Sequence, residues 1–282
     1  MSCLRTLYGP LLSLDFSHVE KNTLCEPFDQ KLIAGFFLTG VATLFASIFI
    51  IAPYGRFGEM TKLFKVPGKF GWIVQESMSW IFFLFTFIKY SDALLHGSHT
   101  TRNLLTAVMY LTHYFHRSLV YPLFRAHSIS GQSFYTFLSA VLFCAVNGYQ
   151  NAKWLIYSQN EPTFHSTIIM VVGFSIWLFG FYFNYKSDQT LIDLRNNNKD
   201  KTQKYFVPTG GLYNYVSSAN YLSEIIEWIG FAIATNHCAS IMFAFWTASN
   251  LIPRAVSIHN WYLEKFPGKI PKHRKAVIPY IL

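Results

Sequence analysis

The sequence predicts an all-α, polytopic membrane protein, and three observations favour this class. Of its 282 residues, 52% are hydrophobic and only 13% are charged, against roughly 25% charged in an average soluble domain. The apolar residues gather in runs long enough for a helix to cross a hydrocarbon core of about 30 Å. The basic residues concentrate in alternate loops between these runs. The composition excludes a disordered chain, a coiled coil, a collagen-like fibre and a small disulfide scaffold.

Seven apolar stretches predict seven transmembrane helices. In chain order they cover residues 32–53, 70–90, 101–122, 133–157, 164–185, 217–235 and 238–260. Only Asn236 and His237 separate the last two, which predicts a tight helical hairpin. We expect residues 1–31 to form an N-terminal segment and residues 32–282 a single membrane domain. Loops as long as the polar interruption at 186–216 are usually functional or disordered. The T-G-G turn and the aromatic residues after it predict that this loop is ordered, at least when a ligand is bound.

The basic residues predict the orientation of the spans. Of the 23 lysines and arginines, 17 fall in one set of alternate loops and six in the other. Cytosolic loops carry the excess of Lys and Arg, so we expect the N-terminus outside or in the lumen and the C-terminus and the 186–216 loop in the cytosol. This topology accounts for the net charge of +9. The basic stretch 272–275 is expected to contact anionic lipids, and neither nucleic acid nor an obligate protein partner is expected.

Several signatures are missing from the sequence. The four cysteines have no metal-binding spacing, and Cys144 and Cys238 lie in apolar runs, where a thiol acts as a small hydrophobe. We therefore expect no metal site and no structural disulfide. The first 30 residues lack the features of a cleaved signal peptide. The chain also lacks a Gly-rich phosphate-binding motif of either common kind.

Polar residues inside the predicted spans are candidate functional residues, because ionisable groups are costly in a membrane. The second span holds Gln75 and Glu76. The third places phenols and one guanidinium on a single helical face: Tyr110, Tyr114, Arg117 and Tyr121. A packing role for Glu76 stays open, as does an interfacial aromatic role for Tyr121.

The later spans carry a second group of polar residues. The sixth span places two carboxylates and an amide on one face: Asn220, Glu224 and Glu227. Near the end of the fifth span, Asn184 and Asp188 are spaced i, i+4, and Arg195 follows on the same side if the helix continues. The seventh span ends with Arg254. This gathering of arginines and amides at the cytosolic ends is typical of a site for an anionic ligand such as a nucleotide cofactor.

The same segments resemble the steroid 5α-reductase family, from about Tyr54 to the C-terminus. The most specific pieces are V-Q-E-S at 74–77, H-Y-F-H-R at 113–117, F-C-A-V-N-G at 143–148, N-Y-K-S-D at 184–188, the block 207–228, the stretch 254–266 and a closing R-K-A-V-I-P-Y. The resemblance implies a membrane enzyme that uses NADPH to reduce the 4,5-double bond of a 3-oxo-Δ4 steroid. For a eukaryotic chain it implies the endoplasmic reticulum membrane.

The resemblance also implies roles for individual residues. Glu76 and Tyr114 would be catalytic and bind the steroid ketone, with Gln75 beside them. The implied cofactor-binding residues are Tyr54, Arg117, Asn184, Asp188, Arg195, Tyr205, Asn220, Glu224, Arg254 and Tyr262. Hydride addition to an enone places negative charge on the ketone oxygen, and a phenol and a protonated carboxylic acid can both donate hydrogen bonds to it. The membrane would supply the lipophilic steroid, and the cytosol the charged cofactor.

Other interpretations stay open. The chain departs from the family pattern at Ser128, Ser139, Lys186 and Ile258, which affects the substrate assignment more than the reaction class. The substrate could instead be another lipid enone, an enoyl thioester or a polyprenol. A membrane methyltransferase of the isoprenylcysteine type, using S-adenosylmethionine, is disfavoured by the Q-E and H-Y-F-H-R motifs. A seven-span receptor or transporter is a third class, although a transporter more often shows inverted repeats.

Overall fold

The chain is almost entirely helical, as predicted. The structure, a computed structural model, describes residues 27–50, 64–91, 100–126, 129–157, 163–197 and 205–282. Their long helices are α2 (Pro27–Phe49), α3 (Gly68–Lys89), α5 (Thr100–Phe115), α6 (Phe134–Tyr157), α7 (Phe164–Asn196), α8 (Ala219–Thr235) and α9 (Cys238–Lys265). The shorter elements are the π-helix η3 (His116–Arg125), the 3₁₀ helix η4 (Gly211–Asn214) and the antiparallel strands β1 (Lys65–Val66) and β2 (Gln132–Ser133).

Each predicted span coincides with a helix, and α5 with η3 together fill the third. The α8–α9 hairpin is as tight as expected. Asn236 adopts the left-handed conformation at φ 49° and ends α8, a conformation that asparagine tolerates better than most residues. His237 then caps α9, because its Nδ1 accepts a hydrogen bond from the Ser240 N–H at 3.1 Å.

Helix α7 continues beyond residue 185, where the predicted fifth span ends. Helix α7 begins at a capping box formed by Thr163 and Ser166 and continues through the polar residues to Asn196. The first part of the predicted 186–216 loop is therefore helical. Hydrophobicity alone ends the span too early, because contacts of Asn184 and Asp188 with neighbouring helices stabilise the polar extension.

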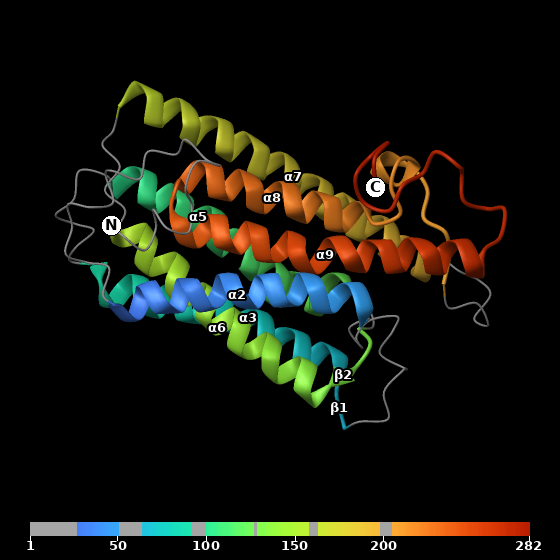
Figure 1. The fold of residues 1–282 in the computed structure, drawn as a ribbon, viewed down its shortest axis with the longest axis horizontal. Coiled ribbons are helices and arrows are strands. Elements are labelled where there is room, and N and C mark those ends of the chain that lie inside the picture. The colour runs from blue at the N-terminus through green and yellow to red at the C-terminus, as the bar shows by residue number, and fades with distance from the viewer. Residues whose placement is uncertain (1–26, 51–63, 92–99, 127–128, 158–162, 198–204) are drawn as a thin grey trace.

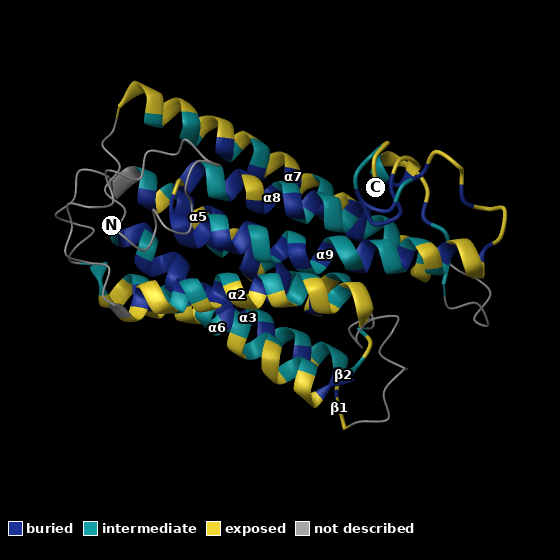
Figure 2. Cartoon of the chain, viewed as in Figure 1, coloured by how far each residue is buried: buried dark blue, intermediate teal, exposed yellow. Residues whose placement is uncertain are grey.

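The outer surface of the bundle fits a membrane protein. Among the described helices, α2, α3, α7 and α9 are long and apolar enough to cross a membrane. Large apolar side chains are exposed along the outer faces, including Phe49, Phe85 and Phe179, and Figure 2 shows the exposed positions on the outside of α2 and α7. Such surfaces are rare on soluble monomers. The number of spans and the side of each terminus stay predictions.

The helices lie side by side in one bundle. At one end of the bundle lie the two strands and the C-terminal segment after α9 (Figure 1). The buried core is aromatic: Phe83 stacks on Tyr110 with ring centroids 4.5 Å apart, and Trp228 lies 4.4 Å from Phe243. Away from that core, Asp29 on α2 pairs with Lys153 on α6 at 3.0 Å, which ties the first described helix to the bundle.

Helices α7 and α8 approach each other unusually closely through glycines. A Cβ atom on Gly180 would lie 2.4 Å from the Glu227 backbone nitrogen, and one on Gly230 would lie 2.3 Å from that of Trp177. Small residues permit such close packing between helices in membranes. The contact holds the backbone of α8 around Glu227 and Gly230 against α7.

We predict that Gly180→Ala destabilises the protein. The new methyl group cannot fit against the α8 backbone, so the helices must separate, and overpacking of this kind typically costs about 1–3 kcal/mol. Thermal unfolding in detergent should show a lower midpoint. Gly35→Ala on α2 is the matched control, because a Cβ there meets no atom within 4 Å. Equal midpoints for the two variants would contradict the assignment of a tight α7–α8 contact.

Candidate active site

A buried charge network joins η3, α7 and α8. Arg117 Nη1 lies 2.7 Å from Asp188 Oδ2, and Arg117 Nη2 lies 3.4 Å from Glu224 Oε2. The guanidinium also lies over the rings of Trp72, 5.0 Å from its centroid, and Tyr121, 5.2 Å from its centroid. Residues predicted on three separate helices therefore meet, and Arg117 is shared between two carboxylates.

Two amides extend this network along α7 and α8. Asn184 Nδ2 donates to the backbone oxygen of Asn220 at 2.9 Å, and Asn220 Nδ2 donates to Asp188 Oδ1 at 3.3 Å. Asp188 is thus held by a cation on one oxygen and an amide on the other. Five predicted cofactor residues form one connected unit: Arg117, Asn184, Asp188, Asn220 and Glu224.

The third helix changes its winding at this network. After Phe115 the α-helix becomes the π-helix η3, which contains Pro122 and ends where the Ala126 N–H donates to the Tyr121 oxygen. Pi-helical segments are rare and occur frequently at functional sites. The predicted stripe assumed α-helical spacing throughout. Its members nevertheless stay together, since Tyr110 lies 4.7 Å from Tyr114 and Tyr121 faces Arg117.

Gln75 and Glu76 form a separate polar group on α3. Gln132 Nε2 donates to Gln75 Oε1 at 2.6 Å, and Gln75 Nε2 donates to Glu76 Oε1 at 3.3 Å. The chain of amides orients the Glu76 carboxyl. One turn before and one turn after Glu76, the indoles of Trp72 and Trp80 donate to the Arg117 backbone oxygen at 2.9 Å and to Ser118 Oγ at 3.0 Å. The face of α3 that carries Glu76 therefore packs against the start of η3, just after Tyr114.

Tyr114 lies in the aromatic core beside this group. Its side chain is buried, and its hydroxyl accepts a hydrogen bond from Asn147 Nδ2 on α6 at 2.9 Å. The same amide nitrogen donates to the Tyr110 hydroxyl at 3.0 Å. Trp228 packs 5.6 Å from the Tyr114 ring. The phenol is therefore held by both packing and hydrogen bonding.

His113 and Glu227 form a second buried contact next to Tyr114. His113 Nδ1 lies 2.7 Å from Glu227 Oε1, and the His113 ring packs 4.5 Å from Trp228. Glu227 was predicted on the face of α8 that carries Glu224, and its carboxylate turns to α5 instead of joining the Arg117 network. The structure thus assigns the two carboxylates of α8 to different partners.

The remaining predicted cofactor residues lie nearer the end of α9. Arg254 is buried, and its Nε donates to the Tyr221 hydroxyl at 3.0 Å. Tyr262 belongs to a buried apolar cluster that includes Ile258. Tyr205 is partly buried and packs against this cluster. Arg195 is exposed and lies outside the Arg117 network, although its charge reaches Tyr121. Tyr54, the last of the set, lies outside the described residues.

The C-terminal segment supports the start of α8. The backbone N–H groups of Ser217 and Ser218 donate to the oxygens of Lys275 and Ala276 at 2.8 and 3.0 Å. Arg274 Nη1 donates to the Pro208 oxygen at 3.0 Å, whereas its buried Nε has no hydrogen-bond partner among the described residues. Burial lowers the pKa of the Arg274 guanidinium from its usual value, yet arginine stays charged in proteins.

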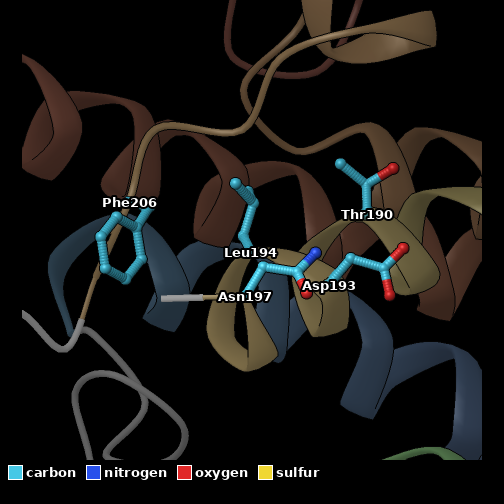
Figure 3. Close-up of a pocket in the computed structure, with 5 residues that line it drawn as sticks. All are labelled: Thr190, Asp193, Leu194, Asn197 and Phe206. Atoms are coloured by element: carbon cyan, nitrogen blue, oxygen red, sulfur yellow. The ribbon is translucent and has the colours of Figure 1, made fainter. Parts of the chain in front are cut away.

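An open pocket of about 430 Å³ lies at the end of α7. Figure 3 shows its lining residues, three from the last turns of α7, the residue that caps the helix, and one from the segment that leads to η4: Thr190, Asp193, Leu194, Asn197 and Phe206. Arg195 belongs to the same turns, and Tyr205 precedes Phe206. The pocket therefore lies beside two predicted cofactor residues.

Metal and thiol chemistry have no visible support in the described part of the chain. Its His, Cys, Asp and Glu side chains form no group of three that could hold a metal ion. Cys144 and Cys238 are buried and form no disulfide within the described part of the chain, whereas Cys3 and Cys25 lie outside the described residues. Of the positions that depart from the family pattern, Ser139 and Lys186 are exposed and Ile258 is buried. Ser128 lies outside the described ranges.

The fold and site define a helical protein with an apolar outer surface and a buried polar site. A family model described as 3-oxo-5-alpha-steroid 4-dehydrogenase matches residues 130–282. The chain is 38% identical over 238 residues to 3-oxo-5-alpha-steroid 4-dehydrogenase 1 of Rattus norvegicus, covering 82% of this chain and 86% of the rat protein. It is 36% identical over 244 residues to steroid 5-alpha-reductase DET2 of Arabidopsis thaliana, covering 83% and 88%. The chain belongs to the steroid 5α-reductase family, as its motifs predict.

Sequence reasoning missed several contacts of this site. Asn147 lies in the F-C-A-V-N-G motif, and the sequence analysis assigns it no role. It is a polar residue inside the predicted span 133–157, the same signal that identifies Gln75 as a candidate. Trp72, which donates from Nε1 to the Arg117 oxygen at 2.9 Å, has no such distinguishing feature. Gln132 and Tyr221 were likewise overlooked, because only the fold brings them to Gln75 and Arg254.

We predict that Asp188→Asn destabilises the protein strongly. The change leaves the buried Arg117 with one carboxylate partner at the longer distance, and breaking a buried ion pair costs about 3 kcal/mol or more. Asp193→Asn is the control on the same helix, because Asp193 is exposed and its side chain accepts a hydrogen bond from Gln189 on the surface. Thermal unfolding in detergent without any ligand should separate the two variants. Equal stability would show that Asp188 does not hold the network together.

Proposed function

We propose that this protein reduces the 4,5-double bond of 3-oxo-Δ4 steroids with NADPH, giving 5α-reduced 3-oxosteroids. The observation that carries the proposal is the joining of two donor groups in one site. Gln75 orients Glu76, and Asn147 holds Tyr114. Hydrogen bonds from Trp72 and Trp80 pack the face of α3 that carries Glu76 against η3, which follows Tyr114 and carries Arg117. Homology to proteins named as steroid 4-dehydrogenases and 5-alpha-reductases supports the same reaction.

The substrate side of this mechanism depends on α3 and α5. The Tyr114 phenol and the protonated Glu76 carboxyl donate hydrogen bonds to the steroid ketone. As a hydride adds to the β-carbon, negative charge moves to that ketone oxygen, where the two donors stabilise it. Because they are fixed before reaction, little reorganisation is needed when the charge appears. The aromatic side chains around Tyr114 exclude water and suit an apolar ring system.

The residues at the α7–α9 end fit a dinucleotide cofactor, which supplies the hydride when it is bound. The set combines amides, tyrosines and arginines, the residue types that bind phosphate and ribose groups. Arg274 adds a buried Nε with no hydrogen-bond partner, within electrostatic reach of Tyr262. The cofactor would be held by the connected network of Arg117, Asn184, Asp188, Asn220 and Glu224. The other residues proposed to bind it are Arg254, Tyr205, Tyr262, the exposed Arg195 and Tyr54. The preference for NADPH over NADH belongs to this proposal.

The membrane arrangement is part of the same proposal. Seven spans, with the N-terminus in the lumen and the C-terminus in the cytosol, place the arginine-rich end on the cytosolic side. The charged cofactor then reaches the site from the cytosol, and the steroid enters from the bilayer. In a eukaryotic cell the host membrane would be the endoplasmic reticulum. We propose no obligate protein partner.

A direct turnover assay tests the proposed reaction. Protein purified in detergent should oxidise NADPH when progesterone or testosterone is added and should release the 5α-dihydro product, identified by mass spectrometry. We expect slower turnover with NADH. Turnover with an enoyl thioester and with no steroid would contradict the substrate assignment. Binding of S-adenosylmethionine without binding of NADPH would contradict the reaction class.

Two variants test the division of labour within the site. Tyr114→Phe and Glu76→Gln should each lower kcat about 10²-fold or more, because each weakens or removes a donor to the developing oxyanion. NADPH affinity, measured by cofactor fluorescence, should stay within about threefold of the wild type, since a general binding effect would appear in the affinity instead. Ser175→Ala, at an exposed position of α7, is the control, because the Ser175 hydroxyl donates to the Val171 backbone oxygen within the helix. Loss of NADPH binding in either variant would contradict the assignment to the substrate.

A further inference from the structure

We propose that Asn147 is a positioning residue that leaves the Tyr114 O–H free to donate to the substrate. The inference deepens the proposed function and rests on it. It assigns a role to a fully buried amide of α6 that does not itself contact the reacting atoms. The argument depends on which atoms donate around Asn147 and on what fixes the amide in that orientation.

The Asn147 amide nitrogen contacts two phenols. Nδ2 lies 2.9 Å from the Tyr114 hydroxyl and 3.0 Å from the Tyr110 hydroxyl, and Asn147 is fully buried. An amide NH₂ carries two protons and only donates, whereas a phenol oxygen both accepts and donates. Both phenols must therefore act as acceptors toward Asn147. Each keeps its own O–H for a different acceptor. Ser79 on α3 interacts with both phenols, and Tyr110 also interacts with Tyr114; in the proposed reaction, the ketone oxygen of the bound substrate accepts from Tyr114.

Asn151 fixes this orientation of the Asn147 amide. Asn151 Nδ2 donates to the backbone oxygen of Asn147 at 3.0 Å and to Asn147 Oδ1 at 2.8 Å. The backbone oxygen can only accept, so it requires the NH₂ group of Asn151 on this side. Because that NH₂ group donates, the Asn147 side-chain atom that faces it must be the acceptor Oδ1. The Asn147 NH₂ must then face the two tyrosines, and exchanging its O and N atoms would oppose donors to donors.

Close packing of α6 against α3 places Asn147 at the site. A Cβ atom on the next residue, Gly148, would lie 2.2 Å from the Ser79 backbone oxygen. Ser79 is one helical turn beyond Glu76 on α3. The glycine contact therefore brings the amide that orients Tyr114 next to the helix that supplies the second ketone donor.

The proposal predicts an unusual order among variants. Asn147→Asp replaces the donor with carboxyl oxygens that accept from Tyr114 and draw its O–H away from the ketone. Asn147→Ala removes the donor without adding a competing acceptor. We expect Asn147→Asp to lower kcat by about 10- to 100-fold, part of the cost of losing one oxyanion donor. Asn147→Ala should lower it less, and NADPH affinity should stay within about threefold in both.

A double-mutant cycle with Tyr114→Phe is the decisive experiment. Single-turnover rates of progesterone reduction are measured for wild type, Asn147→Asp, Tyr114→Phe and the double variant. If Asn147 acts through the Tyr114 hydroxyl, Asn147→Asp should cost less than about threefold once that hydroxyl is gone. If Asn147→Asp does not fold, the same cycle with Asn147→Ala applies, with the same loss of effect expected. Asn103→Asp, a buried change on α5 away from the site, is the control for folding.

The outcomes separate the inference from the proposed function. Multiplicative effects of the two changes would overturn the positioning role, because Asn147 would then act independently of Tyr114. The positioning role would also be overturned if Asn147→Asp and Asn147→Ala lowered the rate equally and Tyr114→Phe had the same effect in each variant as in the wild type. Absence of steroid reduction by the wild-type protein would instead contradict the proposed function.

Discussion

Arg117 imposes the main constraint on this structure, because a buried guanidinium is costly unless its charge is compensated. Asp188 and Glu224 supply that compensation from two different helices, at 2.7 and 3.4 Å. The third helix, α7 and α8 must therefore converge at one depth of the bundle. Ion pairs of this kind add little net stability compared with apolar packing, but breaking one is expensive. They select one helix arrangement over others.

Much of the remaining architecture satisfies this constraint. Gly180 and Gly230 allow α7 and α8 to approach closely enough for both carboxylates to reach one cation. The C-terminal segment pairs with the backbone just before α8 and supports the turn from which Asn220 and Glu224 project. On the other side of Arg117, Tyr114 is one turn earlier on the same helix. One residue thus stands at the boundary between the proposed substrate and cofactor groups.

The sequence predicts the helices better than it predicts the site. Apolar runs locate the spans because helices in a membrane must satisfy their backbone hydrogen bonds internally. The extension of α7 to Asn196 and the π-helix η3 depend on contacts between helices, which hydropathy does not register. Spacing brings Asn220, Glu224 and Glu227 onto one face, yet only packing sends Glu227 to His113. Family motifs identify Arg117 and Asp188, whereas the contacts of Asn147 require three-dimensional structure.

The most direct test of the account follows the hydride itself. NADPH carrying deuterium at the transferable position of the nicotinamide is incubated with the protein and progesterone, and the product is examined by mass spectrometry and NMR. The account predicts one cofactor-derived deuterium at C5 of the steroid, on the α face, and a solvent-derived proton at C4. A product without label at C5, or label transferred to a different acceptor and no reduced steroid, would contradict it.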